Sequence, residues 1–203
     1  MTREPIVFVV DDDEAVRDFL IELISSVGLR VAAYASAQEF LDALEPGSLG
    51  CALLDIRMPG MSGLELQKEL AERAVRLPVI ILTGHGDVQV AVHAMRAGAV
   101  DFIEKPFNNE LLLDRIQRVV AATVDADSAW SKRDEIAHRM DLLTPRERQV
   151  LDLVVAGRTN KDIAHRFAIS EKTVEAHRAK VMEKMRATSF ADLVKMVATL
   201  NLD

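Results

Sequence analysis

The sequence predicts a five-stranded, doubly wound parallel α/β domain followed by a small all-α domain. Between Ile6 and about Thr123, short apolar runs alternate with amphipathic helical segments, which is typical of a parallel sheet covered by helices on both faces. From Thr144 onward only helical patterns remain. The charge divides in the same way, because residues 1–124 carry 11 basic and 19 acidic side chains, whereas residues 125–203 carry 14 and 13.

Five short apolar runs are the predicted strands, and each has the length of a buried strand. They are Ile6–Val10, about Arg30–Tyr34, Cys51–Leu54, Val79–Thr83 and Asp101–Ile103. The single cysteine, Cys51, lies in the third run. We therefore expect a reduced, buried thiol and no intrachain disulfide.

The helices between these strands are indicated by apolar spacing and by residues that suit helix ends. The first helix is expected to place five apolar side chains on one face and to end at Gly28, which suits a left-handed cap. These side chains are Val16, Leu20, Leu23, Ile24 and Val27. Ser36 and Glu39 have the spacing of a capping box at the start of the second helix. Later helices are expected over roughly Gly63–Glu72, Asp87–Ala97 and Asn109–Ala122.

A polar stretch separates the two patterns and is the predicted linker. The predicted domains are residues 1–123 and 141–203, joined by residues 124–140. The second half of this linker has a thin apolar stripe that includes Trp130 and Ile136, so we expect it to be partly helical.

The C-terminal domain is predicted to contain four helices. The run Thr144-Pro145-Arg146-Glu147 combines an N-cap threonine, a proline at the first helical position and a glutamate at the third, and this helix is expected to reach Gly157. The next helices are predicted at about Asn160–Phe167, at about Glu171–Arg186 behind the N-cap candidate Ser170, and from near Ser189. The short turn before Ser170 is typical of a helix-turn-helix.

Reactive side chains follow the ends of the predicted strands. Asp11, Asp12 and Asp13 follow the first strand, Asp55 and Thr83 end the third and fourth, and Lys105 follows the fifth. The carboxyl ends of parallel strands meet at one edge of the sheet. Two carboxylates about 4 Å apart repel by about 4 kcal/mol at an effective dielectric near 20, so such a cluster requires a cation. An oxygen-rich site of this kind suits Mg²⁺ and indicates phosphoryl transfer.

Each of these residues has an expected role in that chemistry, which depends mainly on positioning and charge neutralisation. Asp55 is the expected nucleophile. Asp11 and Asp12, with Asp55 and the backbone carbonyl of Arg57, are the expected ligands of Mg²⁺, or of Mn²⁺ in its place. Lys105 and the Thr83 hydroxyl are expected to bind phosphoryl oxygens, and Asp13 is expected to lie outside the metal's ligands.

Four motifs resemble the receiver domain of two-component response regulators. They are Val9-Val10-Asp11-Asp12-Asp13, Leu54-Asp55-Ile56-Arg57-Met58-Pro59-Gly60, Thr83-Gly84-His85-Gly86 and Lys105-Pro106-Phe107, and the resemblance spans nearly all of residues 5–122. The resemblance implies a flavodoxin-like fold, a phosphoacceptor at Asp55 and a sensor histidine kinase as phosphoryl donor. It also implies that Thr83 and Phe102 are switch residues that move together on phosphorylation.

Alternative functions would require other residue patterns. A lone Asp-Asp pair after a strand is more often a cap or a solvated turn than a metal site, but here all five predicted positions occur together. The remaining alternative is a receiver-like fold that acts without phosphorylation. His85 has no partner at ligand spacing, which favours a loop role. An aspartate-nucleophile phosphatase would need an Asp-x-Asp pattern, which Asp55-Ile56-Arg57 lacks, and an ATPase-driven activator would need a Gly-x-x-x-x-Gly-Lys-Ser/Thr loop, which is absent.

The predicted helix-turn-helix is basic within an acidic protein. Residues 158–186 contain eight lysine or arginine residues and four acidic ones. Phosphate contacts provide most of the affinity for DNA, and a few side chains near the start of the recognition helix read bases. The candidate reading residues are Lys172, Thr173, Glu175, Ala176 and Ala179, and the candidate phosphate contacts are Arg178, Lys180 and Lys184.

The same region resembles the LuxR-type DNA-binding domain. The resemblance rests on Leu143-Thr144-Pro145-Arg146-Glu147-Arg148-Gln149-Val150-Leu151, Asn160-Lys161-Asp162-Ile163-Ala164 and Lys172-Thr173-Val174-Glu175-Ala176-His177-Arg178. Together with the receiver, this domain order and length are similar to the FixJ branch of the NarL/FixJ response regulators. Some relatives have basic residues where this chain has Glu175 and Ala179, so their target sequences do not transfer.

The sequence is therefore interpreted as a DNA-binding transcription regulator rather than an enzyme. The expected partners are a sensor histidine kinase, promoter DNA and a second copy of the chain after phosphorylation, and RNA polymerase is a candidate partner. No run approaches the roughly 20 apolar residues that cross a bilayer, so a cytoplasmic location and no membrane partner are expected.

Overall fold

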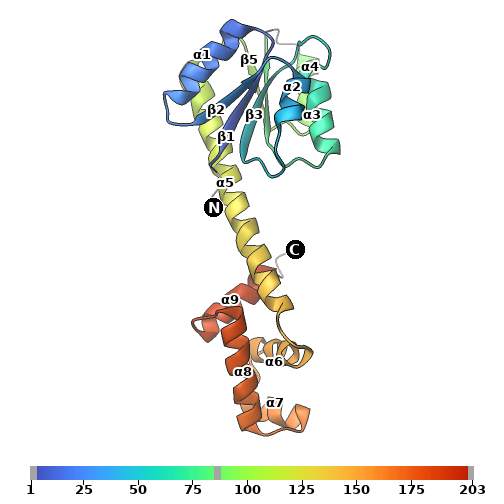
Figure 1. The fold of residues 1–203 in the computed structure, drawn as a ribbon, viewed down its shortest axis with the longest axis vertical. Coiled ribbons are helices and arrows are strands. Elements are labelled where there is room, and N and C mark those ends of the chain that lie inside the picture. The colour runs from blue at the N-terminus through green and yellow to red at the C-terminus, as the bar shows by residue number, and fades with distance from the viewer. Residues whose placement is uncertain (1–3, 85–87, 201–203) are drawn as a thin grey trace. The chain divides into compact units, whose positions relative to one another are not determined.

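The computed structural model describes residues 4–84 and 88–200 and divides into two compact units, residues 1–127 and 128–203 (Figure 1). The loop residue His85 and the predicted helix start at Asp87 lie outside the described residues.

The first unit contains the predicted five-stranded parallel sheet. Its strands are β1 (Ile6–Val10), β2 (Arg30–Tyr34), β3 (Gly50–Asp55), β4 (Val79–Thr83) and β5 (Asp101–Glu104). They lie in the order β2-β1-β3-β4-β5 and all neighbouring pairs are parallel. The order reverses between β1 and β3, so the carboxyl ends of these two strands form the topological switch point of the sheet.

Helices cover both faces of this sheet, as the sequence predicts. They are α1 (Glu14–Ser25), α2 (Ala37–Ala43), α3 (Gly63–Glu72), α4 (Val88–Arg96) and α5 (Asn109–Asp141). Figure 1 shows α1 and the start of α5 on one face and α2, α3 and α4 on the other. Each face has its own core, with Leu20 and Ile116 buried on the first and Phe40 and Leu66 on the second.

Helix α5 extends beyond its predicted end. The sequence predicts that it stops near Ala122, whereas the structure continues the helix through Asp141. Residues 123–141 contain neither glycine nor proline, so nothing in the backbone chemistry ends the helix there. Its last turns belong to the second unit, where Ile136 packs against a core in which Met140 is buried.

The second unit contains the predicted helical domain. Besides the end of α5 it consists of α6 (Pro145–Val155), α7 (Asn160–Phe167), α8 (Glu171–Met185) and α9 (Phe190–Leu200). The core of this domain buries Leu151, Val154, Ile163, Val174 and Val181, while Phe167 and Ile169 are partly buried. The capping box of Thr144 and Glu147 and the Ser170 N-cap are both confirmed.

Two further features concern Cys51 and the apolar character of the helices. Cys51 is buried, and burial raises the pKa of its thiol to about 12. Among the residues that the structure describes, no helix combines the length and the apolar character needed to span a membrane.

Candidate functional site

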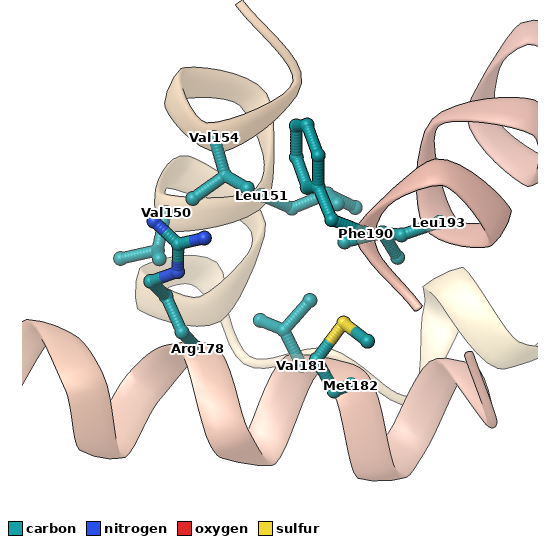
Figure 2. Close-up of a pocket in the computed structure, with 8 residues that line it drawn as sticks. All are labelled: Val150, Leu151, Val154, Arg178, Val181, Met182, Phe190 and Leu193. Carbon is teal, nitrogen blue, oxygen red and sulfur yellow. The ribbon is translucent and has the colours of Figure 1, made fainter. Parts of the chain in front are cut away.

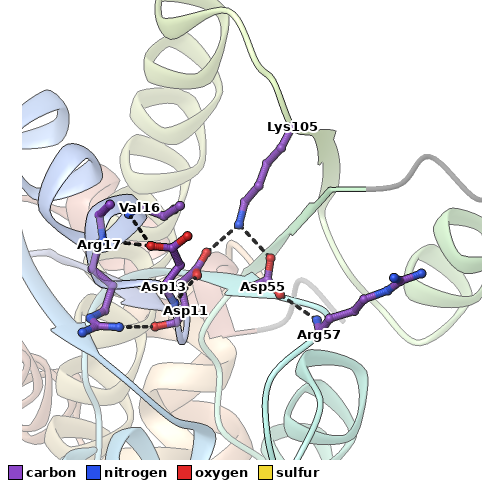
Figure 3. Close-up of polar contacts among 8 residues, drawn as sticks. Asp11, Asp13, Val16, Arg17, Asp55, Arg57 and Lys105 are labelled. Atoms are coloured by element: carbon purple, nitrogen blue, oxygen red, sulfur yellow. Dashed lines mark hydrogen bonds and ion pairs between the residues drawn. The ribbon is translucent and has the colours of Figure 1, made fainter.

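Three of the predicted site residues meet at the switch point of the sheet. Asp11 directly follows β1, Asp55 ends β3 and Lys105 follows β5. The Lys105 ammonium donates hydrogen bonds to Asp11 Oδ2 at 2.6 Å and to Asp55 Oδ1 at 2.7 Å (Figure 3). A single nitrogen therefore links side chains that are 94 and 50 residues away in the chain.

The backbone holds Asp55 from its other side. Asp55 Oδ2 accepts a hydrogen bond from the backbone N–H of Arg57 at 2.6 Å. Helix α3 begins close against this strand end, because a Cβ on Gly63 would lie 2.1 Å from the Asp55 carbonyl oxygen. Only glycine allows this approach, so Gly63 lets α3 begin directly against the strand end that carries Asp55.

Asp11 is held by two residues that have no predicted role in this contact. Its Oδ1 accepts the backbone N–H of Asp13 at 3.0 Å, and its carbonyl oxygen accepts a hydrogen bond from Arg17 Nη1 at 2.8 Å. Asp13 itself caps α1, since its side chain accepts the backbone N–H groups of Ala15 and Val16. An aspartate just before a helix indicates an N-cap, so this part could have been found in the sequence.

The charges in this cluster do not balance. One ammonium faces two carboxylates, and both carboxyl groups are largely shielded from water, with Asp11 2% and Asp55 8% exposed. Burial raises the pKa of Asp11, against the lowering effect of the hydrogen bond from Lys105. For Lys105, burial alone would lower the pKa, but the hydrogen bonds to Asp11 and Asp55 outweigh it and raise the pKa. With both carboxylates ionised, the cluster would have surplus negative charge, which would favour a further cation.

The other predicted metal ligands are not brought into this contact. Asp12 is exposed, and it is the backbone N–H of Arg57 that donates to Asp55 Oδ2. The Arg57 carbonyl stays a predicted metal ligand. Within residues 4–84 and 88–200, no three His, Cys, Asp or Glu side chains are grouped closely enough to bind a metal by themselves. The oxygen donors in place are those of Asp11 and Asp55.

The two predicted switch residues lie on neighbouring strands. Thr83 ends β4 and is 4% exposed, and its carbonyl oxygen accepts the backbone N–H of Lys105 at 2.6 Å. Phe102 pairs with Ile81 in the β4–β5 register and is partly buried against the core beneath α2, α3 and α4. The strand that carries Phe102 is thus connected through Lys105 to the carboxylates.

The second candidate site is the surface of α8. Helix α7 ends at Ala168 in a left-handed conformation, and Ser170 caps α8 by accepting the Thr173 N–H at 3.1 Å. Six of the predicted DNA-binding residues are exposed along α8: Lys172, Thr173, Glu175, Ala176, Ala179 and Lys180. Val174 and Val181 face the core, so these exposed residues form an open helix face.

The remaining two predicted phosphate contacts have partners inside the domain. Arg178 is partly buried and donates from Nη1 to Asn160 Oδ1 at 2.8 Å. Lys184 is predicted as a phosphate contact, whereas the structure places its ammonium 2.6 Å from Glu147 Oε2. Glu147 belongs to α6, so this lysine connects two helices of the domain.

A pocket of about 160 Å³ lies between α6, α8 and α9. Figure 2 shows Arg178 extending from α8 toward Val150 and Val154 of α6, with Phe190 and Leu193 of α9 on the other side. Apart from Arg178 the lining is apolar, so this pocket is an incompletely filled part of the helical core.

Comparison with known families agrees with this division into two sites. The family described as response regulator receiver domain matches residues 7–117. The family described as bacterial regulatory proteins, luxR family, matches residues 141–197.

Similar proteins are found over nearly the full length. The chain is 47% identical to the transcriptional regulatory protein FixJ of Azorhizobium caulinodans, covering 94% of this chain and 90% of that protein. It is 44% identical to FixJ of Bradyrhizobium diazoefficiens, covering 97% and 96%. The solved structure of the response regulator StyR is similar with a TM-score of 0.88 at 42% identity, covering 96% of this chain and 98% of that one.

Proposed function

The chain belongs to the two-component response regulators of the FixJ type, DNA-binding transcription regulators in which a receiver is joined to a LuxR-family domain, and we propose that phosphorylation of Asp55 controls its binding to DNA. The observation that carries this proposal is the contact of Lys105 with both Asp11 and Asp55.

Asp55 is the proposed phosphoacceptor. An oxygen of Asp55 would attack the phosphorus of a phosphohistidine on a sensor histidine kinase, forming a P–O bond as the P–N bond breaks and the imidazole leaves. The Lys105 ammonium, which donates a hydrogen bond to Asp55, would instead donate to a phosphoryl oxygen and balance the charge of that oxygen. The Thr83 hydroxyl is the second proposed phosphoryl ligand.

We propose Mg²⁺, or Mn²⁺ in its place, as the cofactor of this site. The donor set fits a hard cation, since Asp11 and Asp55 present carboxylate oxygens with surplus negative charge. Asp12 and the Arg57 carbonyl complete the proposed ligands. When bound, such an ion would neutralise charge on the phosphoryl oxygens during transfer.

Phosphorylation is proposed to act through Thr83 and Phe102 on a dimer surface. Four large apolar side chains are exposed on α4, just before β5 and at the start of α5, with exposed fractions of 43% for Val92, 48% for Met95, 46% for Val100 and 50% for Leu111. Moving a two-state equilibrium from 1:99 to 99:1 requires about 5.5 kcal/mol, more than one hydrogen bond from Thr83 provides. Burial of apolar surface in a dimer would supply the remainder.

The exposed face of α8 is the proposed DNA-reading surface. Lys172, Thr173 and Glu175, at the start of the helix, would contact base edges together with Ala176 and Ala179, while Lys180 would contact phosphate. A dimer would present two such helices to half-sites about 10 base pairs apart in promoter DNA. RNA polymerase is a further proposed partner, and the cytoplasm is the proposed location.

The proposed domains are a receiver at residues 1–123 and a DNA-binding domain at residues 141–203. The end of α5 packs on the second domain, where Arg139 Nη1 donates to the Met185 carbonyl oxygen at 3.1 Å. An isolated DNA-binding fragment should therefore begin near residue 128, so that this contact is retained.

The test is phosphorylation of the full chain by acetyl phosphate with Mg²⁺, measured by intact mass. We expect one phosphoryl group on the unmodified chain and on Asp42→Asn, an exposed control on α2, and none on Asp55→Asn. Phosphorylation should also convert a monomer to a dimer in sedimentation and tighten operator binding. Full labelling of Asp55→Asn would refute the assignment, and unchanged oligomeric state and DNA affinity after labelling would favour a regulator that acts without phosphorylation.

A further inference from the structure

We propose that Lys184 and Glu147 form a positioning pair that sets the orientation of the recognition helix α8, and that Lys184 makes no phosphate contact. This inference deepens the proposed DNA-binding function and depends on it. Glu147 lies on α6, and Lys184 lies in the last turn of α8, beyond the predicted reading residues.

Lys184 is held at the junction of α5 and α6. Its ammonium donates to Glu147 Oε2 at 2.6 Å and to the Leu142 carbonyl oxygen at 3.1 Å. The Glu147 side chain is 4% exposed and the Lys184 side chain 33%. Moving the ammonium to a DNA phosphate would leave a buried carboxylate without its cation, which is costly in a shielded site.

The Glu147 carboxylate is itself fixed in place by the start of α6. The same Oε2 atom accepts the backbone N–H of Thr144 at 2.8 Å, and Thr144 Oγ1 accepts the Glu147 N–H at 3.3 Å. The hydrogen bond from Lys184, followed by that from Thr144, lowers the pKa of Glu147 to about 2. One oxygen atom thus joins the N-cap of α6 to the last turn of α8.

From this location, a small change in the pair would tilt α8 and displace the reading residues. At 1.5 Å per residue, Lys184 lies about 16 Å along the helix axis from Thr173, so a tilt of about 5° at the pair would displace Thr173 by about 1.5 Å. Hydrogen bonds to base edges tolerate less than that, whereas contacts to the more uniform phosphate backbone depend less on orientation. Loss of the pair should therefore reduce discrimination between sequences more than general affinity for DNA.

Lys180 provides a matched control one turn earlier on the same helix. It is exposed, and among the residues that the structure describes its ammonium makes no ion pair. The two lysines have the same charge but different surroundings. They should therefore differ in the dependence of DNA affinity on salt, which counts phosphate contacts.

The experiment uses the full chain treated with acetyl phosphate and Mg²⁺. Dissociation constants are measured over a range of salt concentrations for the duplex that the unmodified chain selects from a random pool and for a scrambled duplex. For Lys184→Met we expect roughly tenfold weaker binding to the selected duplex, less than threefold weaker binding to the scrambled one, and an unchanged salt slope. For Lys180→Ala we expect binding to both duplexes to weaken equally and the salt slope to become shallower by about one.

Two further variants separate positioning from folding and from direct contact. Lys184→Arg keeps the cation and should restore most of the discrimination. Glu147→Gln should reproduce the loss in Lys184→Met without changing the slope. If Lys184→Met does not fold by circular dichroism, Lys184→Gln replaces it in the same measurements.

The outcomes distinguish failure of this inference from failure of the proposed function. A slope shallower by about one in Lys184→Met would identify a phosphate contact and overturn the inference. An unchanged ratio of selected to scrambled affinity in a folded Lys184 variant would also overturn it. If the unmodified chain selected no sequence at all, the proposed DNA-reading function itself would fail.

Discussion

Two lysines in this protein are hydrogen-bonded to carboxylates at almost the same distance, and their surroundings give them different roles. Lys105 contacts both Asp11 and Asp55 at the edge of the sheet, at 2.6 and 2.7 Å. Lys184 contacts one carboxylate, Glu147, at 2.6 Å. The first cluster has one negative charge more than its lysine neutralises, whereas the second is balanced.

The charge balance separates a reactive site from a structural one. The cluster around Lys105 is expected to gain stability from an added cation, because the two carboxylates repel each other. The Glu147 carboxylate already receives hydrogen bonds from Lys184 and Thr144, so an added charge would gain nothing there. The distances from lysine to carboxylate are similar in the two places, whereas the number of carboxylates per lysine differs.

The largest expected difference is in stability. Glu147→Gln should lower the free energy of unfolding of the DNA-binding domain by about 2 kcal/mol, because it removes a charge-assisted hydrogen bond and weakens a capping box. Urea denaturation monitored by circular dichroism measures this change. Glu171→Gln, at an exposed position in the first turn of α8, is the control and should change the value by less than about 0.5 kcal/mol.

Acid should remove part of the same contribution. The folded-state pKa of Glu147 is lowered from 4.5 to about 2, so its stabilising effect is complete above about pH 4.5 and is lost as the pH falls toward 2. The unmodified chain should therefore lose stability between these values more steeply than Glu147→Gln. If the free energy of unfolding fell equally with pH in the two proteins, Glu147 would not have the lowered pKa that its contacts require.

Magnesium should stabilise the first cluster alone. At ten times its dissociation constant, Mg²⁺ should raise the free energy of unfolding of the receiver by about 1.4 kcal/mol and leave the DNA-binding domain unchanged. Hydrogen exchange measured with and without Mg²⁺ resolves the two domains. Protection that increased equally around Asp55 and Glu147 would contradict the distinction drawn from charge balance.

The smallest expected change comes from removing one of the paired acids. Asp11→Asn relieves carboxylate repulsion and leaves Lys105 paired with Asp55, so receiver stability should stay the same or rise by less than about 1 kcal/mol. Mg²⁺ affinity, measured by titration calorimetry, should nevertheless fall. A loss of stability as large as that of Glu147→Gln would mean that Asp11 is primarily structural.

The sequence alone determined the elements and the residue types at their ends. Strands β1, β2 and β4 and helices α3 and α7 have the predicted bounds, because apolar periodicity and capping residues act over a few neighbouring positions. The meeting of Asp11, Asp55 and Lys105 also followed from the rule that parallel strands bring their carboxyl ends to one edge.

Only the tertiary structure decided which charged groups become partners. Lys184 looks like any basic residue on a recognition helix, and its partner Glu147 is 37 residues away in the chain. Arg139 likewise donates to the Met185 carbonyl oxygen, 46 residues away in the chain, and no local pattern predicts this contact. It lies near the end of α5, which continues past its predicted limit. Helix spacing reports which side of a helix is apolar, but the packing of one helix on another determines which polar group meets a given side chain, and therefore whether a lysine is available to DNA.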